Sequence, residues 1–476
     1  MDSSLALATA KHGYQVAPAG CGKTHLIAET VSKHSSGREL ILTHTHAGVD
    51  VLRRRLKEAV AEPTSFELET IAGWALRYAI SFPRTSGVKN PEPTSPKEWS
   101  QIYTGCAALL ELDPIKEIVR SSYCGVFVDE YQDCSVEQHN LIRKLADTLP
   151  CRVLGDPLQG IFGFNQTPMV DWKTHIEAEF TELPTLTIPW RWNNAGHPNL
   201  GKWLMGIRSD LMSGNGVKLS NSPVEVIWVK QNSVPTQQHQ QRLEVLKEAA
   251  KKTGTVVAIM KWEPECNKLV NNLSHLYSNI EVVACDALMT AALQFETTNG
   301  VQRMAKVVEF ACNCIVGLST EVKTITDVLK AQKASQSRVY TRQVEMDLLK
   351  AVLSTTSLDP ILPALEGLSR VPKVWVWRRE LFYEMLRALR EFYTGDYPSL
   401  KAAAWAVRNK TRHVGRKLGQ RVVSRTLLVK GLEFDHCVLL DADALEMKDL
   451  YVALTRGAQS VTIVSKSNVI SPQTPR

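Results

Sequence analysis

A short loop near the amino end contains the residue types that bind phosphate. Residues 17–24 read APAGCGKT, between an apolar run and an amphipathic one. Such a loop, closed by the start of a helix, points several backbone amides at one place and forms a cradle for phosphate. We therefore expect five contacts from it: Ala17, Gly20 and Gly22 along the backbone, Lys23 at the outer phosphates, and the Thr24 hydroxyl at magnesium.

A second segment, VFVDEYQDCS at residues 126–135, is an apolar run that ends in acids and an amide. Carboxylates are rarely buried unless they are paired or bound to a metal. Phosphoryl transfer needs a metal anchor and a group that orients water, so Asp129 would hold magnesium and Glu130 would polarise the attacking water. An acid pair that only caps the next helix is the alternative.

The composition is that of a soluble globular protein with two or three domains. The 476 residues are 44% hydrophobic and 22% charged. No apolar run reaches the ~18 residues of a membrane span, and the start MDSSLALATAKHGYQ lacks the pattern of a secretory leader. We expect a cytoplasmic protein without a membrane partner. The ten cysteines show no paired CxxC spacing, which favours reduced thiols over a zinc site.

Strand and helix patterns alternate over the first 200 residues, which predicts a parallel sheet covered on both faces. We assign residues 1–198 to a first α/β domain and read about 82–119 as an insertion. A second α/β domain follows over 199–300 and 411–476. Between them, residues 301–410 have a helical pattern and predict an accessory insertion.

The acidic segment DEYQD resembles the DExQD box of the UvrD/Rep/PcrA branch of superfamily 1 helicases, and APAGCGKT is similar to that family's AGAGSGKT. The family's other boxes follow in order: LTHTHAG at 42–48, TIAGWA at 70–75, LGDPLQGIFGF at 154–164, PWRW at 189–192, VKGLEFD at 429–435 and LYVALTRG at 450–457. The resemblance covers both α/β domains. It implies two RecA-like P-loop motor domains that use ATP and Mg²⁺ in the crevice between them.

The resemblance also implies roles at the nucleotide. Gln159 would sense the γ phosphate, and Arg191 and Arg456 would reach it from the far side of the crevice, where positive charge stabilises the transition state. Trp190 stands where the family's Tyr stacks on adenine. Glu433 would contact the ribose or link the nucleotide to strand position.

Four further positions follow from the same comparison of boxes. Gln132 and Asp133 would tie the strand of Glu130 to the γ-phosphate relay. Cys21 replaces a Ser of the family and is read as only a small residue; the alternative is a thiol whose pKa is lowered by the phosphate-binding amides, which would invite modification. Asp2 occupies the place of the family's adenine-reading Gln, so selectivity for adenine stays open.

Single-strand binding would use base stacking, worth ~1–3 kcal/mol per base, together with amides and hydroxyls. By family position Phe164 is the best stacking residue, and Thr45, His46, Thr70 and Trp74 are further candidates. Trp74 lies in an apolar helix pattern, so a position in the hydrophobic core is an equally good interpretation for it. The alternative for His46 is a helix cap whose hydrogen bonds are made within the protein.

A basic segment is a further candidate for binding the DNA backbone. Residues 397–432 contain no acid and nine basic residues, against a net charge of +7 for the whole chain. Arg408, Arg412 and Arg416 are four residues apart and would share one helix face. A solvated helix face is the alternative, and Gly415 and Gly419 weaken the helix prediction.

The resemblance implies an ATP-dependent 3′–5′ translocase or helicase acting on single-stranded or tailed duplex DNA. The alternative is a DNA-stimulated ATPase that senses DNA and licenses a separate nuclease partner, as in Gabija-type phage defence. The predicted insertions of about 40 and 110 residues are short for the family and favour that alternative. A pathway in repair or in defence is not distinguished. A nucleotide kinase or scaffold would leave the arginines of the PWRW and LYVALTRG boxes unexplained.

Overall fold

A computed structural model describes residues 2–90, 93, 95–161, 168–273, 275–280, 285–330, 342–414 and 419–473. The chain divides into two compact units. The first unit consists of Met1–Val229, Lys430–Glu433 and Ala442–Arg476, and the second of Lys230–Val429 and Phe434–Asp441. Among the described residues, no helix has the length and apolar character needed to cross a membrane.

The first unit is built on a six-stranded sheet of order β3-β2-β4-β5-β1-β6 whose pairings are all parallel. The strands are β1 (His12–Val16), β2 (Glu39–Thr43), β3 (Phe66–Thr70), β4 (Gly125–Val128), β5 (Cys151–Gly155) and β6 (Thr181–Leu183). Every residue of β2, β4 and β5 is buried, which explains their largely apolar sequences, because a parallel sheet is covered on both faces.

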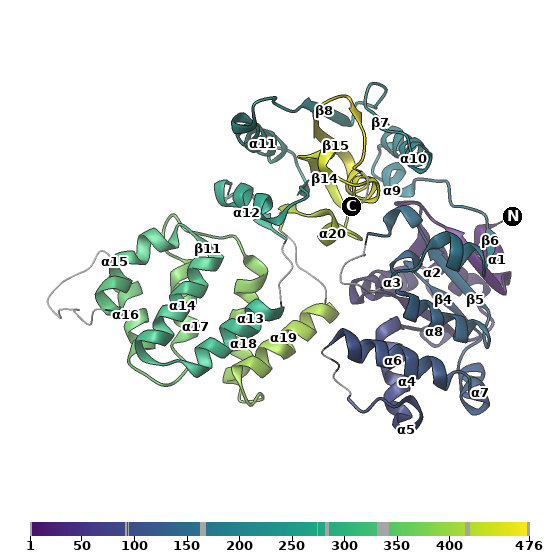
Figure 1. The fold of residues 1–476 in the computed structure, drawn as a ribbon, viewed down its shortest axis with the longest axis horizontal. Helices are drawn as coiled ribbons and strands as arrows, with labels where there is room; N and C mark the ends of the chain where they lie inside the picture. Colours follow the sequence, from purple (N-terminus) through teal and green to yellow (C-terminus); the bar gives the residue numbers. More distant parts are fainter. Residues whose placement is uncertain are drawn as a thin grey trace. The chain divides into compact units, whose positions relative to one another are not determined.

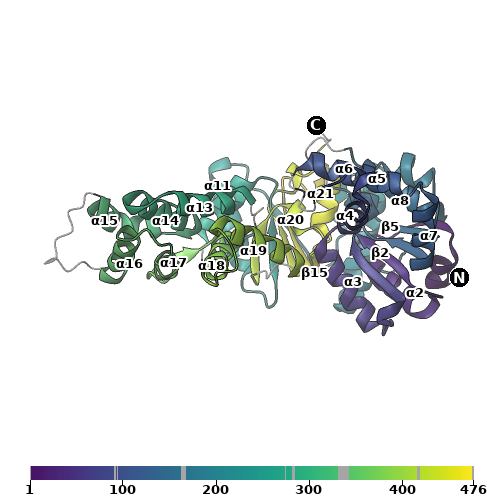
Figure 2. The same cartoon turned by 90° about the horizontal axis from the view of Figure 1, so that it is seen from below.

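Helices cover both faces of this sheet, and alternate strand residues separate its two cores. Leu40 and Leu42 face one core, whereas Ile41 between them faces the other. The first core packs against α4 (Ile71–Ser81), α6 (Pro96–Leu109), α7 (Asp113–Ser122) and α8 (Val136–Ala146). The second packs against α1 (Ser3–Thr9), α2 (Lys23–His34) and α3 (His46–Glu58). Figure 2 shows α4, α6 and α8 on the opposite side of β2 and β5 from α2 and α3.

The segment predicted as an insertion is helical. It contains α5 (Pro83–Ser86), α6 and α7, and its apolar residues join the core under α4 and α8. The helix α6 begins at a capping box in which Ser95 and Glu98 bond to each other's backbone amides, with Pro96 at the first helical position. The rest of the first unit comprises α9 (Trp190–Asn194), α10 (Pro198–Met212), β7 (Val217–Lys218), β8 (Val226–Lys230), α21 (Met447–Leu454), β15 (Gly457–Ser465) and β16 (Val469–Ile470).

A second six-stranded sheet has the order β10-β13-β9-β14-β15-β8. In the second unit its strands are β9 (Val256–Ile259), β10 (Ser278–Asn279), β13 (Arg421–Ser424) and β14 (Phe434–Leu439), and their pairings are parallel. In the chain, the helix α11 (Pro235–Ala249) precedes β9, α12 (Glu263–Asn272) connects β9 to β10, and α20 (Thr426–Val429) connects β13 to β14. The predicted α/β class with two parallel sheets and helical insertions is confirmed.

The second unit also contains a helical body with its own core (Figure 1). Its helices are α13 (Cys285–Thr297), α14 (Gly300–Cys314), α15 (Leu318–Lys330), α16 (Gln343–Leu353), α17 (Ile361–Ser369), α18 (Arg379–Tyr393) and α19 (Leu400–Val414). A two-stranded antiparallel pair, β11 (Ile315–Val316) with β12 (Trp375–Val376), accompanies them. The described helices thus reach beyond both ends of the predicted 301–410 segment, and the domain boundaries stay predictions.

Candidate active site

The phosphate loop connects β1 to α2 at the carboxyl edge of the first sheet. Gly20 and Gly22 have φ angles of 71° and 87°, which glycine adopts without strain. A Cβ on Gly20 would come within 2.6 Å of the Trp192 ring, so the loop has no room for a side chain there. The amide of Ala17 donates to Gly155 O at 2.8 Å and anchors the loop to β5. A glycine cradle at a helix start is suited to an anionic phosphate.

Lys23 connects this loop to the acidic segment. Its Nζ lies 2.7 Å from Glu130 Oε1 and 3.5 Å from Asp129 Oδ1, and Lys23 and Asp129 are buried. Burial raises the pKa of Asp129 to about 6. Burial acts in the same direction on Glu130, but the positive charges of Lys23 and Lys430 outweigh it and lower its pKa to about 2. Glu130 is therefore an anion over the whole neutral range.

The backbone aims Glu130 away from its strand. β4 ends at Val128, and Glu130 has a φ of 56°, in the left-handed region that a non-glycine residue rarely adopts. The amide of Glu130 donates to Asp129 Oδ1 at 2.9 Å, which stabilises this turn before the short 3₁₀ helix η2 (Tyr131–Asp133). The turn leaves both carboxylates on the side of Lys23.

A hydrogen-bonded network continues from Glu130 to the GDPLQ segment. Gln132 Nε2 donates to Glu130 Oε2, and Gln132 Oε1 accepts from the amide of Asp156 at 3.0 Å. Asp156 Oδ2 in turn accepts from Gln159 Nε2 at 3.0 Å, on the 3₁₀ helix η3 (Pro157–Gln159). The structure thus brings the predicted sensor Gln159 and the predicted water-orienting Glu130 into one network.

Lys430 joins the same network from the VKGLEFD box. Its Nζ donates to both carboxylate oxygens of Asp133 and to Gln159 O. Burial lowers the pKa of Lys430 and raises the pKa of Asp133 to about 7. The segment Lys430–Glu433 therefore contacts both polar segments that end the strands β4 and β5.

Arg191 lies against the phosphate loop through its backbone. Its amide donates to Gly20 O at 3.1 Å, and its guanidinium donates to Thr455 O at 2.7 Å and to Glu433 Oε1 at 2.6 Å. Burial alone would raise the pKa of Glu433, but the charge of Arg191 lowers it overall. Trp190 is 48% exposed, and its Cδ1 lies 3.2 Å from a Cβ built on Gly22, so the ring flanks the loop.

Arg456 is fully buried, and three of its nitrogens have protein acceptors. Nε donates to Val452 O, Nη1 to Leu432 O and Nη2 to Thr455 Oγ1, at 2.8–3.0 Å. The helix that precedes it also contacts the loop, because the Tyr451 hydroxyl accepts from the amide of Ala19 at 3.2 Å. In this conformation the Arg456 guanidinium holds the backbone of Val452 and Leu432 in place and does not point freely at the phosphate loop.

Several residues of this network had no predicted role. Asp156, Lys430 and Tyr451 lie inside quoted boxes, whereas Arg208 on α10 belongs to no box and pairs with Asp156 at 2.8 Å. A single arginine in the apolar run WLMGIRSDLM was the only sequence signal for a buried ion pair. The alternative of a lowered pKa for Cys21 is wrong, because burial raises its pKa to about 12.

The candidate DNA contacts have different positions. Thr45 follows β2 and is exposed, whereas Thr70 is the buried last residue of β3; each caps a helix by accepting from the amide of Gly48 or Gly73, respectively. His46 is the first residue of α3 and is half-buried. Trp74 is 0% exposed, with its ring 4.3 Å from that of Tyr78, so it occupies the core position that was its alternative.

Four further candidates fall at the limits of the described residues. Phe164 and Arg416 lie outside them. Arg408 and Arg412 are on α19, whose backbone is described, but their side chains are outside the described part.

The fold and the loop geometry define a P-loop nucleotide-binding protein, and a comparison of families makes this more specific. Residues 95–170 match the model of the UvrD/REP helicase N-terminal domain. The matched region includes Asp129, Glu130, Gln132 and Gln159, so the resemblance to UvrD-like superfamily 1 helicases is confirmed.

Solved structures give weaker likenesses. Two structures of the arterivirus nonstructural protein 10 (helicase), one of them with DNA, are each 13% identical to this chain, with TM-scores of 0.35 and 0.36. The alignments cover 98% of this chain and 63% and 62% of those chains, so the chain spans just under two thirds of their length. No curated protein matches the chain.

Proposed function

We propose that the protein is an ATP-dependent translocase and helicase that moves 3′ to 5′ on single-stranded DNA. The observation that carries this proposal is the network in which Lys23 of the phosphate loop pairs with Glu130, and Glu130 connects through Gln132 and Asp156 to Gln159. Phosphate binding, water activation and γ-phosphate sensing would then share one set of bonds. The family match over this region supports the same activity.

The residues around the loop fit a nucleoside triphosphate with magnesium. The loop amides and Lys23 would hold the phosphates, while Thr24 and Asp129 would hold Mg²⁺, which neutralises charge on the phosphate oxygens when it is bound. Asp129 fits this ligand role because it is buried beside a carboxylate and a single ammonium group. Glu130 would leave Lys23 to orient the water that attacks the γ phosphorus, giving ADP and phosphate.

The arginines would respond to the same phosphate. Arg191 now donates to Glu433 Oε1, and a γ phosphate would compete with this carboxylate for the guanidinium. Exchange of one anion for the other gives the site two arrangements, one for each nucleotide state. Arg456 would join by exchanging its backbone acceptors for the phosphate, as the family role implies. Trp190 would stack on the adenine.

We further propose the domain roles that the sequence predicts. Residues 1–198 would form the first motor domain, 199–300 with 411–476 the second, and 301–410 an accessory insertion. Thr45, His46 and Thr70 would contact the DNA strand at the carboxyl edge of β2 and β3. Because Thr45 is exposed and uses its hydroxyl as a helix cap, it would present backbone and methyl groups to DNA, whereas the buried Thr70 would contribute through the backbone of the helix that it caps.

The test measures ATP hydrolysis and strand displacement by the purified protein. We expect single-stranded DNA to stimulate hydrolysis and a 3′-tailed duplex to be unwound in preference to a 5′-tailed one. Absence of DNA-stimulated hydrolysis would contradict the proposal. Stimulation without displacement would instead point to the DNA-sensing ATPase with a nuclease partner, which no contact among the described residues favours. RNA of the same sequence serves as the control for nucleic acid type.

A further inference from the structure

We propose that Arg208 is a positioning residue for ATP hydrolysis, acting through Asp156; this inference rests on the function proposed above. Arg208 projects from α10 and donates from Nη2 to Asp156 Oδ1 at 2.8 Å. The side chain of Arg208 is 9% exposed and that of Asp156 is 0% exposed, so the pair is formed away from water.

Asp156 holds both glutamines of the network. Its Oδ2 accepts from Gln159 Nε2 at 3.0 Å, and its amide donates to Gln132 Oε1 at 3.0 Å. Its Oδ1 also accepts from the amide of Leu158 at 3.2 Å, which fixes the turn of η3. Gln132 then donates to Glu130, so the direction of the Asp156 carboxylate determines where two side chains of the hydrolysis site point.

Arg208 provides the charge that keeps this carboxylate in place. Among the described residues, it is the cation that forms an ion pair with Asp156, whereas Lys23 pairs with Glu130 and Lys430 with Asp133. A fully buried carboxylate without a cation is costly, and it relieves that cost by taking up a proton or by rotating toward water. Rotation would take Oδ2 away from Gln159 Nε2, and protonation would weaken this oxygen as an acceptor.

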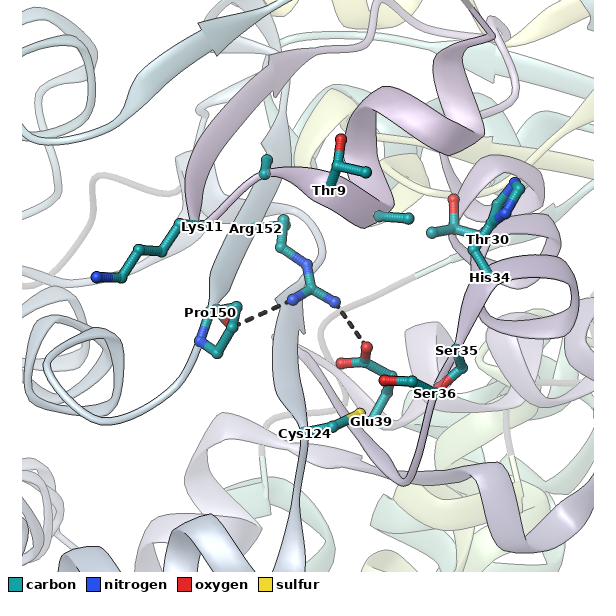
Figure 3. Close-up of a pocket in the computed structure, with 12 residues that line it drawn as sticks. Thr9, Lys11, Thr30, His34, Ser35, Ser36, Glu39, Cys124, Pro150 and Arg152 are labelled. Atoms are coloured by element: carbon teal, nitrogen blue, oxygen red, sulfur yellow. Dashed lines mark hydrogen bonds and ion pairs between the residues drawn. The ribbon is translucent and has the colours of Figure 1, made fainter.

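The other end of β5 provides a matched comparison. Arg152 Nη2 donates to Glu39 Oε1 at 2.8 Å, and both side chains are buried. This pair has the same chemistry and the same distance as Arg208 with Asp156, but its bonds lead to Pro150 O and not to Glu130 (Figure 3). Loss of Arg152 would therefore show what the loss of any buried arginine does to the first unit.

The experiment compares Arg208→Met, Arg208→Lys and Arg152→Met in the full chain. It measures kcat and KM for ATP with saturating single-stranded DNA, and the affinity for a fluorescent ATP analogue. We expect Arg208→Met to lower kcat by roughly 10- to 100-fold, because misplacement of catalytic groups by about 1 Å has such effects. Its KM and its affinity for the analogue should stay near those of the wild type.

Arg208→Lys should give an intermediate kcat, since a lysine supplies the charge without the fixed fork of donors. Arg152→Met should lower the unfolding temperature and keep kcat. A wild-type kcat in folded Arg208→Met, or an equal loss of kcat in Arg152→Met, would overturn the inference. If Arg208→Met does not fold, Arg208→Lys decides: a reduced kcat at unchanged KM supports the inference, and a wild-type kcat overturns it.

A double-mutant cycle with Asp156→Asn tests the route. If Arg208 acts through Asp156, adding Arg208→Met to Asp156→Asn should cause no further loss of kcat. Additive losses would overturn this route. A wild-type protein without DNA-stimulated hydrolysis would contradict the proposed function itself, whereas an active wild type with an equally active Arg208→Met would contradict only the role of Arg208.

Discussion

At each end of β5 a buried arginine pairs with a buried carboxylate at 2.8 Å: Arg152 with Glu39 at the amino end, and Arg208 with Asp156 at the carboxyl end. The two pairs differ in what surrounds them. Around Asp156 the hydrogen bonds continue to Gln132, Glu130 and Lys23. Around Glu39 the bonds of the pair lead to Pro150 O, and the nearby hydroxyls of Thr9 and Thr30 bond within their own helices.

The amino end has a cavity of about 230 Å³, lined by the last residues of α1 and α2 and by Glu39, Cys124 and Arg152 (Figure 3). The hydroxyl of Thr9 donates to Leu5 O, and that of Thr30 to Leu26 O, each within its own helix. Helices end here, so their carbonyl groups, which carry partial negative charge, face this edge. An anion such as a phosphate is disfavoured at that edge.

The carboxyl end has the opposite polarity. The helices α2, α3 and α4 begin there, directly after β1, β2 and β3, and their amino ends favour an anion. The same six strands therefore give one edge that tolerates a buried ion pair for stability and another that favours an anion and carries the proposed ATP site. The general rule that parallel sheets bind ligands at their carboxyl edge follows from this polarity.

Glu130→Gln is the change with the largest expected effect, and it acts at the carboxyl edge alone. The amide keeps the shape of the side chain but cannot accept a proton from water, so we expect kcat for ATP to fall about 10²- to 10⁴-fold. Binding of a fluorescent ATP analogue should persist, because Lys23 loses an anionic competitor. Glu39→Gln is the matched control and should keep kcat; retained turnover in Glu130→Gln would contradict the assigned role.

The sequence predicted the elements of this edge better than their connections. The alternation of strand and helix patterns predicted the first parallel sheet. Because Lys23 and Glu130 each follow a strand of that sheet, both were expected at its carboxyl edge, where they now form an ion pair. The pair of Arg208 with Asp156 joins residues 52 positions apart, and no local pattern encodes such a contact. The contact of Lys430 with Asp133 spans 297 positions and depends likewise on tertiary packing.

In the hydrophobic core, too, some contacts follow from the sequence pattern and others depend on tertiary packing. The alternation of Leu40, Ile41 and Leu42 between two cores follows from the strand period of two residues. Whether Trp74 faces solvent or core could not be decided from an apolar helix pattern, because the position of the packed helices α6 and α8 determines it. The backbone turn at Glu130 was also not predictable, since its φ of 56° opposes the preference of the residue type.

Arg152→Met should have the next largest effect, and that effect should be on stability. Removal of one partner from a buried ion pair costs about 3–5 kcal/mol, because the other charge stays buried. We expect this loss in the free energy of unfolding of the first unit, measured by denaturant titration followed by tryptophan fluorescence. The double variant Arg152→Met with Glu39→Gln should recover part of it. Unchanged stability would remove the contrast between the two ends of β5.

Trp190→Ala should have the smallest effect, on nucleotide affinity. Stacking of a base on an aromatic ring is worth about 1–3 kcal/mol, so KM for ATP should rise roughly 5- to 150-fold while kcat changes little. Trp190→Tyr should restore affinity. Trp228→Ala removes a tryptophan of similar exposure on β8 and serves as the control. A fall in kcat without a change in KM would show that Trp190 supports Arg191 and not the base.

The most direct test of the account is a structure of the full chain with Mg²⁺ and a non-hydrolysable ATP analogue. The account predicts the analogue's phosphates on the loop of residues 17–24, with Lys23 Nζ moved from Glu130 to the phosphates and the Arg191 guanidinium moved from Glu433 to the γ phosphate. An analogue bound elsewhere, or an Arg191 that keeps its bond to Glu433 beside a bound γ phosphate, would contradict it.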